Sequence, residues 1–388
     1  MTKTIHTTLP FDEWGANARL AADTLEMKPA HGVPSWMFLA MDIAFIEQVS
    51  GHAPGAYRAD PDTVYLDFQR AVGACMIDQY LAANPGTMTN HGYDSDTERA
   101  ATTGAAQIAR DGIVIDSPEA VAEHLERFVF PRLQAEIRST NPGDPAASAA
   151  IVAEERRIQT IMGPDMLKVP YVFHFPGLRY GEYGYEHYLT AYLIYPELIE
   201  RDFALQSDLA RLRNTQIARA VVEGGLPKVI RLDHDMADSR GLLVDVRTLD
   251  RLWFPHFSHA IQPLLDAGIR LIWHCDGNLM QMVPRLLEAG IGGFQGFQYE
   301  DGMDYERICA MRTREGDPLM IWAGVSVTRT LPSGTPDDVR REIAWLVKHG
   351  PKTGLFLGPS SSIVPGTPWN NLQTMIEGLA HYREHGRS

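Results

Sequence analysis

The stretch IRLIWHCDGN, residues 269–278, is a short apolar run that ends abruptly in polar groups. Its first half, Ile269–Trp273, has the pattern of a buried strand. His274 and Asp276 follow at a spacing of two, so their side chains point the same way if strand geometry persists. A helix is predicted next, over Leu279–Ala289. The stretch therefore predicts a strand that delivers an imidazole and a carboxylate to one point at its C-terminal tip.

Seven more runs of this kind alternate with helical segments, in near-strict order from residue 165 onward. Such alternation predicts a parallel sheet, and eight units predict an α/β fold of the (β/α)₈ TIM-barrel type. Residues 113–165 are helical in pattern and are expected to lie outside the barrel core. We therefore expect a single barrel domain over residues 1–388, with a helical insertion or flanking segment around 113–165. Besides the focal strand, the predicted strands are Val33–Leu39, Met76–Ala83, Val169–Phe175, Lys228–Leu232, Ile291–Phe297, Pro318–Ala323 and Thr353–Leu357.

Composition and charge exclude several classes of protein. The 388 residues are 45% hydrophobic and 22% charged, which is a globular composition. The formal net charge of −14 disfavours binding to nucleic acid or to an anionic membrane. No apolar run is long enough to span a bilayer and the first ten residues lack a signal-peptide core, so we expect a cytoplasmic protein. The three cysteines show no CxxC spacing, which argues against a disulfide framework.

Polar side chains fall at the predicted C-terminal ends of several strands. A lone His or Asp after a strand often only caps the next helix. Five such clusters on one rim of a barrel instead favour a ligand site, because active sites of these barrels lie at that rim. The clusters are His174; Asp233, His234 and Asp235; His274, Asp276 and Asn278; Gln298 and Glu300; and Ser360, Ser361 and Ser362.

His274 is the best metal-ligand candidate, because neutral imidazole suits zinc and other divalent ions. Asp276 and Glu300 can complete the ligand set, and zinc is the expected metal. Asp235 either holds a polar group of the substrate or acts as a general base. The predicted catalytic residues are Asp235, His274 and Asp276. The predicted substrate-binding residues are His174, Arg231, His234, Asn278, Gln298 and Ser361.

Two further features allow an ordinary structural interpretation. Cys275 points away from His274 in strand geometry, and packing as a small hydrophobe is the favoured interpretation. A run of tyrosines could form a lid over an apolar substrate. Helix packing at i, i+3 and i+7 explains the last three of them equally well. These tyrosines are Tyr180, Tyr183, Tyr185, Tyr188 and Tyr192.

The C-terminal half resembles the uroporphyrinogen decarboxylase superfamily, and within it the corrinoid-linked methyltransferase branch. The matching segments are DHDMADSRGLLVD, HCDGNL, PRLLEAGIGGFQGFQ, GMD, WAGV and LGPSSSIVPGTPWNN. AYRADPD at 56–62 and the MID of residues 76–78 resemble the N-terminal part of that branch more weakly. The resemblance covers most of residues 30–385, with 228–375 the specific portion. It implies a (β/α)₈ barrel with its active site at the C-terminal rim.

This sequence also departs from the family in ways that bear on chemistry. The decarboxylases carry an arginine-rich stretch after the first strand, where this chain reads WMFLAMDIAFI, and their catalytic aspartate falls at about Asn84 or Pro85. Porphyrinogen decarboxylation is therefore not expected. In the zinc methyltransferases a His-x-Cys pair and a later Cys hold the metal. Here His274 matches the histidine, whereas Asp276 and Ser361 stand in place of the two thiolates.

Three functions remain open from the sequence. The first is a demethylase-type methyltransferase that moves a methyl group from a small methylated O- or N-compound to a corrinoid or folate acceptor. It would activate the leaving group with a metal or an acid. The cobalamin would sit on a separate corrinoid protein, the candidate partner; the alternative acceptor is tetrahydrofolate. The second function is a metal-assisted decarboxylase or lyase acting on a small carboxylic acid. The third is a non-catalytic ligand-binding barrel. A homodimer is compatible with the sequence.

Overall fold

The computed structural model describes residues 13–87 and 108–387. Its N-terminal part is helical, and the sequence explains where two of these helices begin and end. Asp42 accepts hydrogen bonds from the first backbone N–H groups of α2, which ends at Gly51 in the left-handed conformation. Asp60 caps α4 in the same way, with Pro61 at its first position. The elements are α1 (Ala16–Leu25), α2 (Ile43–Ser50), α3 (Ala56–Ala59), α4 (Pro61–Ala71), β1 (Met76–Ile77) and a 3₁₀ turn (Asn84–Thr87).

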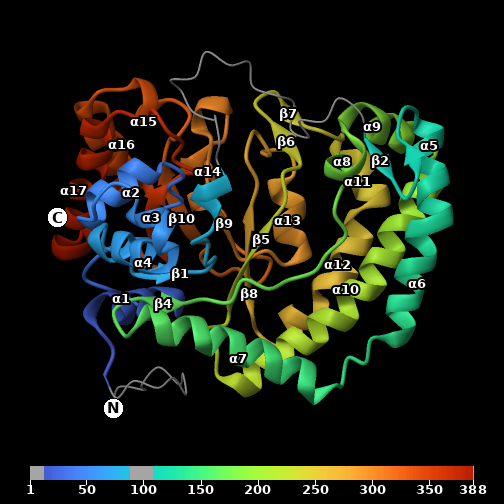
Figure 1. Ribbon diagram of the computed structural model, residues 1–388, viewed down its shortest axis with the longest axis horizontal. Helices are drawn as coiled ribbons and strands as arrows, with labels where there is room; N and C mark the ends of the chain where they lie inside the picture. Colours follow the sequence, from blue (N-terminus) through green and yellow to red (C-terminus); the bar gives the residue numbers. More distant parts are fainter. Residues whose placement is uncertain (1–12, 88–107, 388) are drawn as a thin grey trace.

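The middle of the chain places a helical layer outside the strands. The elements are β2 (Ala109–Arg110), β3 (Ile113–Val114), α5 (Pro118–His124), a π-helical turn (Leu125–Val129), α6 (Phe130–Ser139), α7 (Pro145–Met162), β4 (Leu167–Lys168), α8 (Tyr180–Tyr183), α9 (Tyr185–Ile194) and α10 (Pro196–Gly224). Helices α6 and α7 pack against α10, and α5 packs against α9 (Figure 1). The segment around 113–165 thus packs mainly on helices.

From residue 229 onward strands and helices alternate, as the sequence pattern predicts. The elements are β5 (Val229–Asp233), β6 (Ala237–Asp238), β7 (Gly241–Leu242), α11 (Val246–Leu252), α12 (Phe254–Asp266), β8 (Arg270–His274), α13 (Val283–Ala289), β9 (Gly293–Gln295), a 3₁₀ turn (Tyr299–Asp301), α14 (Tyr305–Ala310), β10 (Met320–Val325), α15 (Thr330–Ser333), α16 (Pro336–His349), β11 (Leu355–Pro359) and α17 (Trp369–His385). None of the described helices combines a bilayer-spanning length with the apolar composition that a membrane core demands.

The main sheet has five parallel strands in the order β11-β10-β9-β8-β5, and β1 pairs with β4 in a separate parallel ladder. Two parallel bridges connect these parts, because Ser35 pairs with Leu357 of β11 and Trp36 pairs with Met76 of β1. Eight parallel segments therefore follow one another from β4 through β1, residues 35–36 and β11 to β5. Within the described residues, no ladder hydrogen bond joins β4 to β5. The structure thus shows a mixed α/β fold built on parallel strands.

The three N-terminal strands are shorter than the sequence predicts. Val33–Leu39 contributes only the bridges at 35–36, and of Met76–Ala83 only two residues pair. The strand predicted at Val169–Phe175 lies just before it, at Leu167–Lys168. Pro170 has no N–H with which to extend the ladder. The chain beyond it is held by ring packing instead, with Phe175 5.5 Å from the Trp273 ring centroid.

Candidate functional site

The candidate site lies where β5 and β8 end side by side. The two strands pair in parallel with Asp233 opposite His274, so both chains leave the sheet at the same level. The loop after β5 carries Asp235, and the loop after β8 carries Asp276. Because these strands are neighbours, residues 41 positions apart meet at the rim: the Asp276 N–H donates to Asp235 Oδ1 at 2.9 Å.

His274 is buried and its ring is oriented by the backbone of β9. Its Nδ1 lies 3.3 Å from the carbonyl oxygen of Gln295. A carbonyl can only accept, so Nδ1 carries a proton in this contact and Nε2 is left for another partner. Nε2 lies 4.0 Å from an oxygen of Asp233 and 4.0 Å from an oxygen of Asp276. The imidazole therefore presents a free nitrogen to carboxylates at the rim.

Asp235, His274 and Asp276 form a three-residue cluster, which we call the rim group. Each residue offers one ligand atom, and these atoms lie within 4.8 Å of one another. His274 is buried, whereas Asp235 and Asp276 both reach solvent, so the group opens outward. One imidazole nitrogen and two carboxylate oxygens are a suitable donor set for zinc or a similar divalent ion. The residues present therefore fit a metal. Ser361 Oγ donates to Asp276 Oδ2 at 3.2 Å and orients that carboxylate.

A second set of charges lies directly beneath the rim group, and we call Asp78, Arg231 and Asp233 the buried network. The Arg231 Nε donates to Asp78 at 2.7 Å and its Nη1 donates to Asp233 at 2.9 Å. The Arg231 side chain is 1% exposed and that of Asp78 is 0% exposed. Tyr171 donates its hydroxyl to the same oxygen of Asp233, at 3.0 Å. The cation of this network is thus supplied by the protein itself.

The two environments move the pKa values of neighbouring carboxyl groups in opposite directions. Burial alone would raise the pKa of Asp233, but His274, Arg231 and the Tyr171 hydroxyl outweigh it, and the pKa falls below its ordinary value. At Asp276, burial and the nearby Asp235 and Asp233 outweigh the attraction of His274, and the pKa is raised. Asp276 is therefore the carboxylate of the site that lacks sufficient positive charge.

Several predicted substrate-binding residues hold loops in place. The Gln298 side chain accepts the Gly277 N–H at 2.7 Å, and Asn278 Oδ1 accepts the Met280 N–H. His234 Nε2 accepts the Leu178 N–H at 2.9 Å, and burial lowers the pKa of this ring. His174 is half-buried, and burial, followed by Arg213, lowers its pKa to about 4. These histidines are neutral near pH 7.

Arg231 and Glu300 are both held by side chains of the protein. Arg231 is buried and bonds both Asp78 and Asp233, so two carboxylates of the protein already hold its guanidinium. The Glu300 carboxylate accepts hydrogen bonds from the Ser326 and Thr328 hydroxyls, because the 3₁₀ turn after β9 directs it there. The cluster of potential ligands within the described residues contains Asp235 in place of Glu300.

The alternatives for Cys275 and the tyrosines can also be compared with the structure. Cys275 is buried, its sulfur accepts the Met236 N–H at 3.2 Å, and burial raises its thiol pKa. It is a packed side chain rather than a ligand. Tyr188 and Tyr192 are buried in the helical layer, as helix packing predicts, whereas Tyr185 is exposed. Tyr180 differs, because its ring stacks on His234 and its hydroxyl donates to the Asp235 carbonyl.

Sequence reasoning missed three residues that shape the site. Asp78 directly follows β1, so the carboxylate near the end of this strand is Asp78 and not position 84 or 85. The same strand-end argument that selected His274 could have found it. Tyr171 carried no distinguishing signal. Gly296 has a positive φ of 69°, and a Cβ there would lie 3.0 Å from the His274 ring. A glycine is therefore required where β9 passes the imidazole.

No family model and no curated protein matches the chain. Among solved structures, the chain is similar to a methyltransferase from Methanosarcina mazei, with 16% identity and a TM-score of 0.56 over 95% of this chain and 99% of that one. It also aligns with a B12-independent methionine synthase from Shewanella sp. W3-18-1 in complex with selenomethionine, at 14% identity over 48% and 54% of the two chains. The TM-score of that alignment is 0.27, too low to establish a common fold. The chain therefore shares its overall fold with the Methanosarcina mazei protein.

Proposed function

We propose that this protein is an enzyme that transfers a methyl group from a small methylated oxygen or nitrogen compound to a corrinoid or folate acceptor. The single observation that carries the proposal is the rim group: three potential ligands converge at the carboxyl ends of β5 and β8 and open outward. The fold shared with the Methanosarcina mazei methyltransferase supports methyl transfer as the general chemistry. A corrinoid carried by a separate protein is the proposed acceptor, and tetrahydrofolate is the alternative.

We further propose that the rim group binds one divalent ion, zinc being the expected one. Asp235, His274 and Asp276 would hold it through one nitrogen and two oxygens. When bound, such an ion polarises the oxygen or nitrogen that departs from the methyl group, which is the difficult part of methyl transfer from an ether or amine. The raised pKa of Asp276 favours the same conclusion, because a nearby cation would stabilise its charged form.

The chain's own residues have separate tasks in this proposal. Asp235, besides its place among the ligands, would accept a hydrogen bond from the substrate on the open side of the rim group. Ser361 orients Asp276, and the Gln295 carbonyl holds His274 so that Nε2 faces the rim. The buried network fixes Asp233 beneath them as a permanent anion.

A metal analysis combined with a substrate panel tests the function. Purified protein should bind about one zinc, and a panel of methoxy compounds and methylamines should yield methylcobalamin when cob(I)alamin is supplied. Methyl transfer to tetrahydrofolate instead would select the other acceptor. Release of CO₂ from a small carboxylic acid would identify a lyase, and ligand binding without turnover would identify a binding protein. Either of these last results would overturn methyl transfer.

We also propose that the eight parallel segments close into one barrel, and that residues 1–388 form a single domain with 113–165 outside it. Two side-chain contacts near the open end of the ladder support closure. Tyr171, just beyond β4, bonds Asp233 of β5, and Asp78, just beyond β1, bonds Arg231 of β5. Unfolding should then follow one cooperative transition for all regions. Separate transitions for the parts before and after residue 165 would contradict the proposal.

A further inference from the structure

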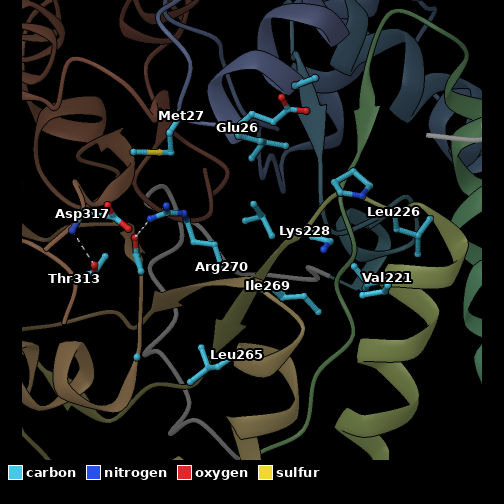
Figure 2. Close-up of a pocket in the computed structure, with 18 of the residues that line it drawn as sticks. Glu26, Met27, Val221, Leu226, Lys228, Leu265, Ile269, Arg270, Thr313 and Asp317 are labelled. Carbon is cyan, nitrogen blue, oxygen red and sulfur yellow. Dashed lines mark hydrogen bonds between the residues drawn. The ribbon is translucent and has the colours of Figure 1, made fainter. Parts of the chain in front are cut away.

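A cavity of about 670 Å³ lies at the opposite end of β5 and β8 from the rim group. Figure 2 shows it between the end of α10, the start of β8 and the segment that follows α1, with Lys228, Ile269 and Arg270 directed along its walls. Its volume lies within the range of small-molecule sites. The two ends of β5 are roughly 13 Å apart at about 3.3 Å per residue, so this cavity is separate from the candidate active site.

Arg270 is the most informative residue of this cavity. Its Nη1 donates to the carbonyl oxygens of Gly292 at 3.1 Å and Pro318 at 3.4 Å. Within the part of the chain that the structure describes, no carboxylate lies within 4.0 Å of its guanidinium. Burial lowers its pKa, although Asp317 and Glu315 act at longer range to raise it. The guanidinium is thus held partly out of water without a direct counter-ion.

The backbone beneath Arg270 is shaped to hold the side chain in this position. A Cβ on residue 292 would lie 2.8 Å from the Arg270 Cγ and 3.3 Å from its Nη1. Only glycine therefore lets the arginine lie flat across the start of β9. The orientation of the guanidinium depends on the surrounding chain and not only on solvent.

The remaining lining combines balanced charges with an apolar wall. Its charged side chains are Lys228, Arg270 and Arg314 against Glu26, Glu315 and Asp317. Arg314 pairs with Glu315, whereas the hydrogen bonds of Arg270 go to backbone carbonyls. Lys228 makes a single hydrogen bond, to the Ala267 carbonyl at 3.3 Å. The apolar part of the wall consists of Leu25, Met27, Val221, Leu226, Leu265 and Ile269.

We propose that this cavity is a second binding site, which takes a small organic anion whose carboxylate meets Arg270 and whose apolar body lies against the aliphatic wall. A guanidinium offers two parallel N–H donors that match a carboxylate. Two neighbouring carbonyls occupy only Nη1, so the other nitrogens are available for such a ligand. The proposal does not depend on the reaction at the rim.

Calorimetric titration of the full chain with hexanoate, at constant pH and ionic strength, tests this site. Hexanoate should bind with a Kd of about 1 mM or tighter, as a ligand of this size allows. Arg270→Met should raise that Kd roughly tenfold or more, since a charge-assisted contact is lost. Gly292→Ala keeps the charge but displaces the guanidinium, and should weaken binding in the same direction.

Three controls make the outcome specific. Arg247→Met removes an arginine that is 93% exposed on the surface and should leave hexanoate binding unchanged. His274→Ala alters only the other end of β8 and should also leave it unchanged. Inorganic phosphate lacks the apolar body and should bind more weakly than hexanoate. The proposal is overturned if wild type does not bind hexanoate saturably, if folded Arg270→Met binds it as tightly, if His274→Ala abolishes binding, or if phosphate binds equally well.

Discussion

The buried network and the rim group both contain two carboxylates and one nitrogen-bearing side chain, but they differ in how their charges are balanced. In the buried network, the Arg231 guanidinium lies between Asp78 and Asp233, and both Arg231 and Asp78 are buried. In the rim group, Asp235 and Asp276 face one imidazole, and the cluster opens outward. The first carries its own cation, whereas the second has too little positive charge, as the raised pKa of Asp276 indicates. The comparison teaches that the buried charges stabilise the fold, whereas the open ones are available for chemistry.

The largest expected effect is a loss of stability when the buried network is broken. Arg231→Met leaves Asp78 and Asp233 without their cation, and breaking a buried ion pair typically costs about 3–5 kcal/mol. Urea unfolding should show this loss in the free energy of unfolding. Arg231→Met combined with Asp78→Asn should recover part of it. A single variant within 1 kcal/mol of wild type, as an order-of-magnitude threshold, would show that the network is not structural.

The next largest effect is expected on zinc affinity when His274 is replaced. His274→Ala removes one of three ligands, so zinc affinity should fall by more than the roughly 10- to 100-fold that outer partners contribute. Activity should be lost with the metal, while the circular dichroism spectrum stays unchanged. Dialysis against buffered zinc measures the affinity. His174→Ala is the matched control, because this half-buried histidine lies outside the rim group. Full zinc occupancy in His274→Ala would remove it from the ligand set.

Replacement of the Asp235 carboxylate is expected to lower the turnover rate. Asp235→Asn keeps an oxygen that accepts the Asp276 N–H, so the loop should keep its shape. Loss of the carboxylate should lower kcat by about 10²-fold, the usual scale for general acid–base catalysis. Asp304→Asn replaces one helix cap with an equally good one and should leave kcat unchanged. An unchanged kcat in Asp235→Asn would mean that Asp235 only holds the loop.

The smallest expected effect is a change in the stability of the metal-free protein, and its sign distinguishes Asp276 from Asp233. The raised pKa of Asp276 means that its ionisation opposes folding, and this penalty is complete at neutral pH. Metal-free Asp276→Asn should therefore be more stable than wild type at pH 7. The gain should stay below about 1 kcal/mol, because the side chain is 37% exposed and solvent screens it.

Asp233→Asn should have the opposite sign. The lowered pKa of Asp233 stabilises the fold above the ordinary carboxyl pKa, and this contribution is lost as pH falls through the folded-state pKa. The amide should therefore cost about 1–3 kcal/mol at pH 7, the scale of hydrogen bonds to charged groups. Parallel urea titrations at pH 7 compare the two variants. Equal signs would contradict the division into stabilising and functional carboxylates.

The sequence predicted the elements whose signal is continuous along the chain. Strands β5 and β8 to β11 are buried along nearly their whole length, and each overlaps one of the predicted apolar runs. The three short N-terminal strands gave a misleading signal, because an apolar run such as VPYVFHF packs its rings without pairing its backbone. The length of an apolar run in the sequence therefore does not predict how many of its residues pair in a strand.

The residues of the candidate site likewise fall into those that the sequence could predict and those that it could not. His274 and Asp276 could be paired from their spacing, and Asp235 from its place after the preceding strand. Asp78 and Arg231 are 153 residues apart, and nothing in the local pattern of either residue indicates the other. Glu300 lies at the expected strand end, but the direction of its side chain is set by a 3₁₀ turn that the sequence pattern did not reveal. Local spacing predicts position, whereas orientation depends on tertiary partners.

The positions of Asp235 and Asp276 also bear on how this kind of site can change during evolution. Each lies two residues beyond the last ladder residue of its strand, Asp233 or His274. An exchange of carboxylate, thiolate or amide at either position therefore leaves the ladder hydrogen bonds in place, and the contact at risk is the one from the Asp276 N–H to the Asp235 side chain. Selection can alter the ligand set, and with it the metal or the leaving group, at little cost to the fold. The same exchange at Asp233 or Arg231 would disturb the buried network, so variation among descendants of this chain should concentrate in the two loops.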